Sequence, residues 1–238
     1  MKVEIWSDVV CPWCYIGKRR FEAALSRFAH RDQVEVVWRS FELDPTTVSE
    51  LAPGGPDHAE RLAAKYGMSP AQARDAVAGV TAAAAGEGLD YHLETSLPAN
   101  TFDAHRLIHL AAGHGLQDAA EERLMRAYFT EGQALGDPAV LVRLAAEIGL
   151  DEAEAERVLA GDAYADAVRA DEAEARSLQV TGVPFFVMDR RYGVSGAQPA
   201  AQLLAALEQA WAEHTPLQVM APAGGGTDEA CGPDGCPI

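Results

Sequence analysis

The feature that most restricts the fold of this chain is the sequence Cys-Pro-Trp-Cys at residues 11–14, between a predicted strand and a predicted helix. The run from Val3 to Val10 alternates and then becomes apolar, which is typical of a strand. Pro12 suits the first turn of a helix, and from Cys14 onward apolar residues recur at helical spacing. The first cysteine is therefore predicted to lie at a helix N-terminus, with the second one turn further along.

This placement predicts dithiol chemistry. At a helix N-terminus, backbone N–H groups and the helix dipole stabilise a thiolate, the form of cysteine that attacks a disulfide. We therefore expect Cys11 to be the nucleophile and Cys14, deeper in the helix, to resolve the mixed disulfide. Pro12 fixes the entry angle of the helix, and Trp13 offers a flat apolar surface to a polypeptide or a small thiol.

Composition excludes several other classes of function. The 238 residues include 48% hydrophobic residues, enough for a folded core, and the net charge is 19 − 36 = −17. Counterion release from nucleic acid and attraction to an anionic membrane both need Lys and Arg, so neither partner is expected. With no basic-then-apolar leader and no run of about 18 apolar residues, the sequence predicts a cytoplasmic protein. Paired cysteines in a reducing compartment are more often catalytic or metal-binding than structural.

The rest of the chain predicts an α/β fold that is interrupted by helices. A second β-rich run at 34–38 completes a βαβ unit, and Pro and Gly then mark a loop. The long middle segment is rich in Ala, Leu, Glu and Arg at helical spacing, and β character returns as a hairpin followed by a last helix. The predicted organisation is a first thioredoxin-like part at 1–57, an all-helical insertion at 58–179, a second thioredoxin-like part at 180–215, and a flexible Gly/Pro-rich tail at 216–238.

Two further groups of residues are candidates for a functional site. Pro184 follows Val183 just ahead of a predicted strand, where the peptide bond is either cis or a commoner trans bond that begins the strand. His105, His109 and His114 could suggest a metal ion, but no Glu completes a His-Glu-x-x-His pattern. We interpret these histidines as packing or surface residues, and the acidic run at 151–174 as a solvated helical face. Neither a metal nor an organic cofactor is predicted.

A second cysteine pair, Cys231 and Cys236, lies in the predicted tail. The short segment between them contains Gly and Pro, so a disulfide ring can close, and the Gly-rich stretch before it could act as a tether. One hypothesis is that this pair exchanges with Cys11 and Cys14; the alternative is an idle or metal-scavenging pair. A zinc site made of all four cysteines is disfavoured by the strand-to-helix context of the first two.

The motif and its surroundings resemble the DsbA-type thioredoxin-fold oxidoreductases, and among them the FrnE-like cytoplasmic proteins. The resemblance covers roughly residues 1–213 and is carried by segments 7–18, 41–43, 100–106 and 181–187. It implies a thioredoxin-like fold in which a cis Val183–Pro184 peptide faces the Cys11 sulfur. It also implies that the backbone of Val183 pairs with an extended substrate.

The resemblance leaves the direction of the reaction open. Periplasmic members carry a histidine between their cysteines, whereas this chain carries the uncharged Trp13, so we expect a less oxidising pair. The expected partners are thiols or disulfides, either polypeptides or low-molecular-weight thiols such as glutathione. Two alternatives remain: a glutathione-dependent enzyme similar to 2-hydroxychromene-2-carboxylate isomerases and kappa-class glutathione transferases, which typically carry serine in place of Cys11, or a non-enzymatic chaperone-like module.

Overall fold

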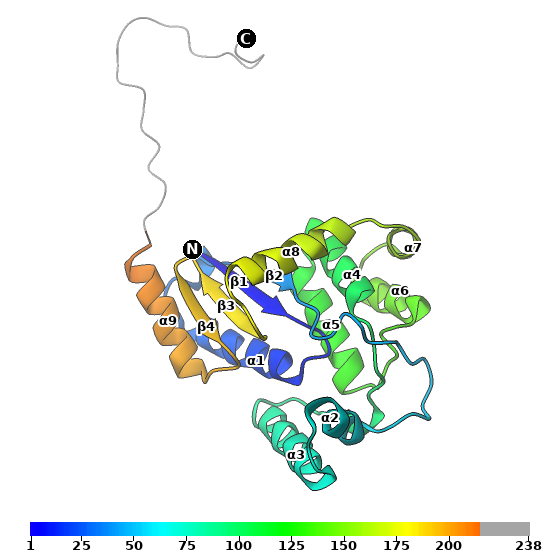
Figure 1. The fold of residues 1–238 in the computed structure, drawn as a ribbon. Coiled ribbons are helices and arrows are strands. Elements are labelled where there is room, and N and C mark those ends of the chain that lie inside the picture. The colour runs from blue at the N-terminus through cyan, green and yellow to red at the C-terminus, as the bar shows by residue number, and fades with distance from the viewer. Residues whose placement is uncertain (215–238) are drawn as a thin grey trace, which may run out of the picture.

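A computed structural model describes residues 1–214, which form a four-stranded mixed sheet with helices on both faces (Figure 1). The strand order is β2-β1-β3-β4, with β1 parallel to β2 and antiparallel to β3, and with β3 and β4 paired as an antiparallel hairpin. The strands are β1 (Lys2–Ser7), β2 (Glu35–Ser40), β3 (Phe185–Met188) and β4 (Tyr192–Ser195).

Most of the helices lie in the chain between β2 and β3, as the sequence predicts. Ser69 and Asp137 cap α3 and α6 with their side chains, each directly before a proline at the first helical position. The helices are α1 (Pro12–Arg27), α2 (His58–Tyr66), α3 (Pro70–Gly86), α4 (Phe102–Gly113), α5 (Gln117–Phe129), α6 (Pro138–Glu147), α7 (Glu152–Ala160), α8 (Ala165–Ser177) and α9 (Ala200–Ala212).

The two faces of the sheet are covered by different helices. Successive side chains of a strand point to opposite faces. Val3 and Ile5 of β1 accordingly pack in one apolar cluster with α1 and α9, while Trp6 packs on the other face with Ala175 of α8. This layered arrangement confirms the predicted mixed sheet flanked by helices.

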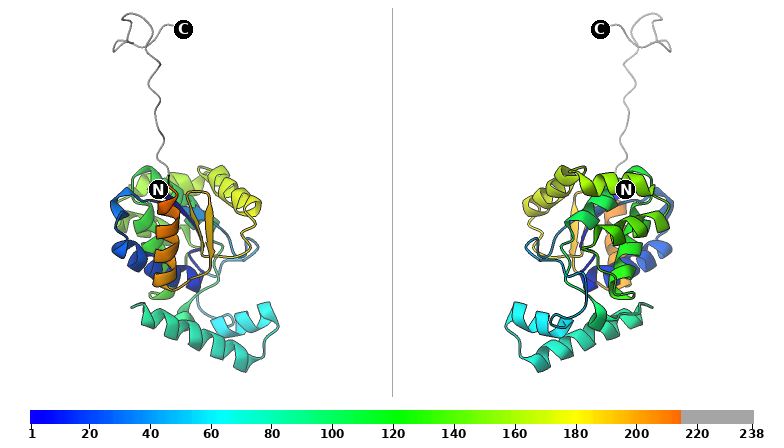
Figure 2. Two further views of the ribbon diagram at one scale, coloured as in Figure 1. Left: turned by 90° about the vertical axis from the view of Figure 1, so that its left-hand side faces the viewer. Right: turned by 90° about the vertical axis from the view of Figure 1, so that its right-hand side faces the viewer.

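The helices between β2 and β3 form a second core that includes the start of α1. Cys11, Cys14, Tyr15 and Ile16 all belong to this cluster, together with apolar residues of α3 to α7. The surroundings of the two cysteines are therefore built jointly by the sheet-bearing part and by the helical part. Helices α2 and α3 form a layer of their own beneath the rest (Figure 2).

Two sequence-based expectations are wrong in detail. Strand β1 ends at Ser7 rather than Val10, because Asp8 turns the chain: its carbonyl accepts the Cys11 N–H at 3.0 Å. The acidic run at 151–174 is not uniformly solvated. Asp171 of α8 is buried against the sheet and accepts hydrogen bonds from the Arg39 guanidinium at 2.9 Å and from a backbone N–H of β2.

The described residues end at His214, whose Nδ1 lies 2.5 Å from Asp189 Oδ2 at the turn between β3 and β4. Cys231, Cys236 and the predicted tail at 216–238 lie outside the described residues. Among residues 1–214, none of the helices has the length and apolar character needed to cross a membrane.

Candidate active site

Cys11 is the N-cap residue of α1. Its backbone is extended (φ −86°, ψ 113°), and Pro12 begins the helix behind it. The carbonyl of Cys11 accepts the N–H of Cys14 at 3.0 Å, so the two cysteines lie one turn apart as predicted. Both thiols are free, and both side chains are buried, with 4% of Cys11 and 1% of Cys14 exposed. The difference leaves Cys11 as the more accessible sulfur.

The loop before β3 closes over Cys11. The Cys11 thiol donates a hydrogen bond to the Val183 carbonyl with a separation of 3.6 Å, and the Val183–Pro184 peptide is cis, as the resemblance implies. Gly17 of α1 allows this approach, because a Cβ at that position would lie 2.7 Å from Pro184 Cγ. Sequence reasoning did not single out Gly17, since its role depends on a residue that is distant in the chain.

The Cys14 thiol lies in a different environment. Burial, reinforced by the neighbouring Cys11, raises the pKa of Cys14 well above its usual value. The backbone of Asp8 and the side chain of Ser7 act in the opposite direction. Cys14 is therefore the enclosed and protonated member of the pair at neutral pH.

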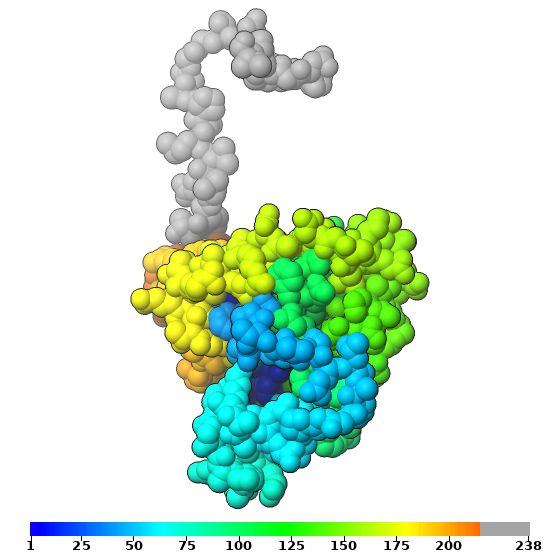
Figure 3. All heavy atoms as spheres, turned by 45° about the vertical axis from the view of Figure 1, so that its right-hand side comes forward, coloured from blue at the N-terminus to red at the C-terminus, as the bar shows by residue number. Residues whose placement is uncertain are grey.

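A hollow on the surface lies beside the start of the chain. Figure 3 shows dark blue atoms from the start of the chain at the bottom of a hollow, which is bordered by segment 41–57 and by α2 and α3. Trp13, between the two cysteines, is 45% exposed. Segment 41–57 and the end of α2 add further exposed apolar side chains: Leu43, Val48, Leu51 and Tyr66.

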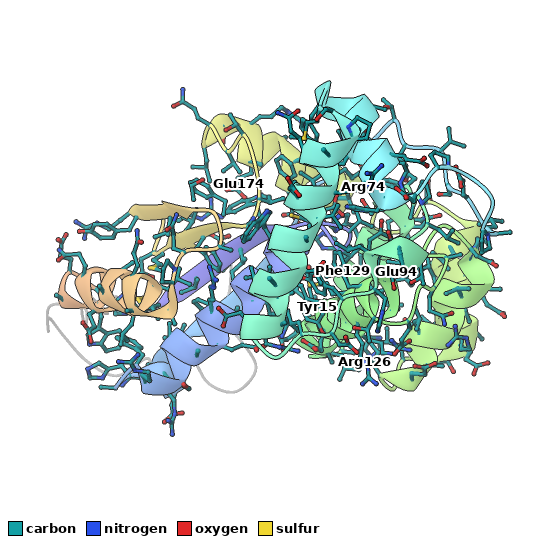
Figure 4. All side chains as sticks on the ribbon, turned by 90° about the horizontal axis from the view of Figure 1, so that it is seen from below. Tyr15, Arg74, Glu94, Arg126, Phe129 and Glu174 are labelled. Atoms are coloured by element: carbon teal, nitrogen blue, oxygen red, sulfur yellow. The ribbon has the colours of Figure 1, made fainter. Side chains whose placement is uncertain are left out.

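The helical part holds the motif through an aromatic stack. The hydroxyl of Tyr91 donates a hydrogen bond to the Pro12 carbonyl at 2.7 Å. The Tyr91 ring stacks on Phe129 with centroids 4.6 Å apart, and Tyr15 stacks on Phe129 at 6.1 Å. Tyr15 and Phe129 lie side by side next to α3 in Figure 4. Tyr91 is a site residue that the sequence did not reveal, because it lies 79 residues from Pro12.

Three ionisable side chains are buried beside the motif: Asp8, His105 of α4 and Glu121 of α5. His105 Nε2 lies 3.6 Å from Asp8 Oδ1. Burial alone would lower the pKa of His105, but Asp8 and Glu121 raise it above its ordinary value. Burial raises the pKa of Glu121 to about 7, against the opposing charges of His105 and Lys18. His105 is therefore buried, as the interpretation as a packing residue requires. That interpretation omits the carboxylates that raise its pKa.

The other two helix histidines have separate partners. His109 Nε2 lies 3.0 Å from Asp171 Oδ2 and 3.1 Å from Ser40 Oγ, so both contacts use one ring nitrogen. A Ser-His-Asp relay needs both nitrogens, and this group is therefore a structural clamp. His114 pairs with Glu154 at 3.1 Å. Within residues 1–214, no three His, Cys, Asp or Glu side chains gather as a metal site would require.

Comparison with known proteins identifies the class of this fold. The sequence model of the DSBA-like thioredoxin domain matches residues 2–208. A crystal structure of a probable DsbA oxidoreductase from Streptomyces coelicolor is 51% identical, with a TM-score of 0.86, and the match covers 100% of this chain and 99% of that one.

Two more distant structures share the fold. The cytosolic disulfide reductase DsbM from Pseudomonas aeruginosa, solved with glutathione, is 20% identical with a TM-score of 0.63, over 89% of this chain and all of that one. A 2-hydroxychromene-2-carboxylate isomerase is 17% identical with a TM-score of 0.61, over 88% of this chain and 95% of that one. At these identities the likeness concerns the fold.

Proposed function

This chain belongs to the DSBA-like thioredoxin domain family, and from that premise we propose that it is a thiol–disulfide oxidoreductase working through Cys11 and Cys14. One observation carries the proposal: Cys11 caps a helix N-terminus with its sulfur 3.6 Å from the Val183 carbonyl, beside the cis Pro184. A nucleophilic thiolate needs the field of such a helix end. The enclosed Cys14, one turn away, suits the resolving role.

The proposed reaction proceeds in two exchanges. The Cys11 thiolate attacks one sulfur of a substrate disulfide, forms a mixed disulfide and releases the other sulfur as a thiolate, which takes a proton from solvent. Cys14 then attacks the Cys11 sulfur, the Cys11–Cys14 disulfide forms, and the second substrate thiolate leaves. Two electrons pass from the enzyme to the substrate, and the reverse sequence oxidises a dithiol. Since the electrons come from thiols, no organic cofactor is needed.

Trp13, Val183 and Pro184 are proposed to shape the substrate groove. Trp13 offers an exposed apolar surface, and Val183 lies next to the Cys11 sulfur, where its backbone would pair with an extended substrate segment. The substrate class is a disulfide or thiol, either in a polypeptide or in a small thiol such as glutathione; DsbM, which shares the fold, was solved with glutathione. We propose a cytoplasmic location, as for DsbM.

We propose that Cys231 and Cys236 exchange disulfides with the first cysteine pair of the same chain. The residues between His214 and Cys231 could span about 58 Å when fully extended, at ~3.4 Å per residue. His214 stands at the Lys2 end of β1, since Asp189 contacts both residues, and the six-residue strand β1 accounts for about 20 Å toward Cys11. The linker is long enough for Cys231 and Cys236 to exchange with Cys11 and Cys14.

Trapping experiments test these assignments. Cys14→Ser should accumulate a Cys11 mixed disulfide with glutathione, and Cys11→Ser should reduce dithiol-dependent insulin reduction to the uncatalysed rate. Full activity of Cys11→Ser in every redox assay would overturn the proposal. For the tail, mass spectrometry of Cys14→Ser should find Cys11 joined to Cys231 or Cys236; its absence in all redox buffers would limit the site to the first pair.

The same assays distinguish the two alternative functions. A glutathione-dependent isomerase or transferase would bind glutathione and turn over its substrate in Cys14→Ser as in the wild type, because that chemistry needs no resolving thiol. A chaperone-like module would suppress aggregation of a partner in both cysteine variants. Loss of exchange in Cys11→Ser together with a trapped intermediate in Cys14→Ser supports the oxidoreductase.

A further inference from the structure

The proposed nucleophile is nearly closed off from solvent. Only 4% of Cys11 is exposed, and its sulfur lies 3.6 Å from the Val183 carbonyl. The rate of thiol–disulfide exchange depends on the access of one sulfur to another, because the attacking sulfur must reach a bonded sulfur of the substrate. Exchange at Cys11 therefore requires that part of its surroundings moves aside.

The surroundings of Cys11 on the side of the sheet are fixed. The Pro184 carbonyl accepts the N–H of Gly196 at 2.8 Å, which holds the loop before β3 to the end of β4. The same loop lies tightly against α1, because a Cβ at Gly17 would be 2.7 Å from Pro184 Cγ. The element that moves is therefore to be sought on the helical side of the motif.

Helix α3 is the helix of that side with the weakest attachment. It buries three of its 17 residues, the smallest share among the helices that contribute to the apolar cluster of Cys11 and Cys14. The helix lies next to α1 in Figures 1 and 4, which view the molecule from directions 90° apart. Small side chains bury little apolar area, so detaching α3 costs less free energy than detaching α4 or α5. Its side chains in or against the cluster are Val77, Val80, Ala83 and Ala84.

The chain on both sides of the α2–α3 pair is suited to act as a hinge. Segment 51–57, which leads into α2, is exposed at every residue and has no regular secondary structure. It contains Gly54 at φ 147°. Beyond α3, Gly88 has φ 76°, a left-handed conformation that glycine adopts without strain. Hinges are commonly a few loop or element-terminal residues of this kind.

The two helices are joined so that they move together. The N–H groups of Gly67 and Met68 both bond to the Ala63 carbonyl and close the end of α2. Ser69 follows directly and caps α3 through the reciprocal bonds of a capping box with Gln72. The connection is short and is hydrogen-bonded to both helices, so α2 moves with α3.

A cavity of about 470 Å³ separates the start of α2 from the rest of the molecule. Segment 53–57 and Arg61 line it on one side, and segments 92–97 and 130–132 line it on the other. The polar contacts that cross it, such as the hydrogen bond from Arg61 Nη2 to the Ser96 carbonyl at 2.9 Å, can be exchanged for contacts with water. Because this space is not filled by packed side chains, the start of α2 can shift without a steric clash.

We propose that helices α2 and α3 form a movable cover of Cys11, an inference that rests on the proposed function. The pair turns as one unit about segments 51–57 and 86–88, α3 separates from α1, and the Cys11 sulfur becomes accessible to a substrate disulfide. The exchange that follows is the one described above. The observed rate of any reaction at Cys11 is then the rate in the open state multiplied by the fraction of molecules that are open.

A chain in which Cys11 is the only cysteine tests the cover. Cys14→Ser, Cys231→Ser and Cys236→Ser together give this background chain, and mass spectrometry follows the alkylation of Cys11 by iodoacetamide. Val80→Ala removes two methyl groups with which α3 packs in the cluster. The open fraction, and with it the alkylation rate, should therefore rise about fivefold or more.

Val158→Ala is the matched control. Val158 belongs to the same apolar cluster and is 5% exposed, against 7% for Val80, but it lies in α7, outside the cover. It should leave the alkylation rate unchanged, although it too weakens the core. Oxidised glutathione serves as the second probe. Its mixed disulfide with Cys11 should form faster in Val80→Ala by the same factor as alkylation, because both reactions need the same opening.

The outcomes distinguish the cover from the function on which it rests. An unchanged alkylation rate in folded Val80→Ala overturns the cover and leaves the oxidoreductase intact. An equal rise in Val158→Ala also overturns it, since Cys11 would then be exposed by general unfolding. The same holds for faster alkylation without faster formation of the mixed disulfide, because the substrate would then reach Cys11 by another route.

Two further results complete the test. A background chain that is alkylated at Cys11 but forms no mixed disulfide refutes the proposed function itself, and the alkylation rates still decide whether α2 and α3 cover Cys11. If Val80→Ala does not fold, Val77→Ala replaces it. Val77 packs against the same cluster from a partly buried site, so its truncation should raise the alkylation rate about twofold, and an unchanged rate there overturns the cover.

Discussion

Helices α4 and α5 and helices α2 and α3 all lie between β2 and β3 in the chain, and residues of α3, α4 and α5 share an apolar cluster with Cys11 and Cys14. They are packed in opposite ways. Seven residues are buried in α4 and seven in α5, including His105, Glu121 and Phe129. In contrast, α3 buries three residues and α2 buries none. Figure 2 shows the same contrast, with α2 and α3 as a layer beneath the body.

The helical part of the molecule therefore contains two differently packed helix pairs. The tightly packed pair α4 and α5 shares an apolar cluster with Cys11 and Cys14, and Phe129 of α5 stacks on Tyr15 of the helix that carries the motif. The loosely packed pair α2 and α3 borders the surface hollow beside the start of the chain. Regions with few buried apolar contacts open locally at low free energy. The predictions below test this division.

The largest expected contrast is in stability. Phe129→Ala removes a fully buried ring that stacks on both Tyr91 and Tyr15, and the free energy of unfolding should fall by about 3–5 kcal/mol. Val80→Ala in α3, at a site 7% exposed, should cost about 1–2 kcal/mol. Urea unfolding measures both. Equal losses would show that α3 contributes to the core as strongly as α5 and would break the comparison.

Acidification should increase the stabilisation that Glu121 contributes in α5 and decrease the stabilisation that His58 contributes in α2. The folded pKa of Glu121 is raised to about 7, so its stabilisation is complete below its unfolded pKa and is lost as pH rises through 7. The pKa of His58, at the start of α2, is lowered by burial to about 4. As pH falls, His58 is therefore protonated in the unfolded state before it is protonated in the folded state. The free energy of unfolding then decreases as pH falls from 6.5 toward 4. Between pH 8 and pH 5, each effect should reach about 2 kcal/mol.

Hydrogen exchange measured by mass spectrometry, corrected for intrinsic rates, resolves this pH effect by region. Amides of α5 should become more protected at pH 5 than at pH 8, and amides of α2 less protected. His58→Gln should abolish the acid response of α2 and leave that of α5 unchanged. A response of the same sign in both helices would contradict the opposite electrostatic environments.

The hydrogen bond from Tyr91 to the motif should have an intermediate effect. Tyr91→Phe keeps the stacked ring but leaves the Pro12 carbonyl without its donor, which should cost about 1–3 kcal/mol. The alkylation rate of Cys11 should change as well, because Pro12 begins the helix that positions it. Tyr66→Phe in α2, where the side chain is 62% exposed, is the matched control and should change neither quantity. A Tyr91→Phe protein with wild-type stability and alkylation would remove Tyr91 from the site.

The sequence predicts those parts of the site that depend on local signals. The spacing of Cys11 and Cys14 between a strand and a helix predicts their placement, and the motif around Pro184 carries the resemblance that implies its cis peptide. Tyr91 and Glu121 give no such signal, because their approach to the motif depends on how whole helices pack. The burial of Asp171 has no local signal either. A row of acidic residues predicts a solvent-exposed helix face, and only the folded structure shows that the adjacent sheet supplies a cation, Arg39.

The smallest expected effect concerns the link between α3 and the helix that carries the cysteines. Arg20 Nε of α1 lies 2.6 Å from Glu87 Oε1, at the end of α3, and both side chains are partly exposed. Such a pair contributes about 0–1 kcal/mol, so Glu87→Gln should barely change global unfolding. Hydrogen exchange in α3 should nevertheless quicken, because one of the few ties between α3 and α1 is lost. Glu152→Gln, an exposed carboxylate on α7, should leave exchange in α3 unchanged. Unaltered exchange in Glu87→Gln would mean that α3 is held by its apolar contacts alone, and that the α2–α3 pair is more rigid than its packing indicates.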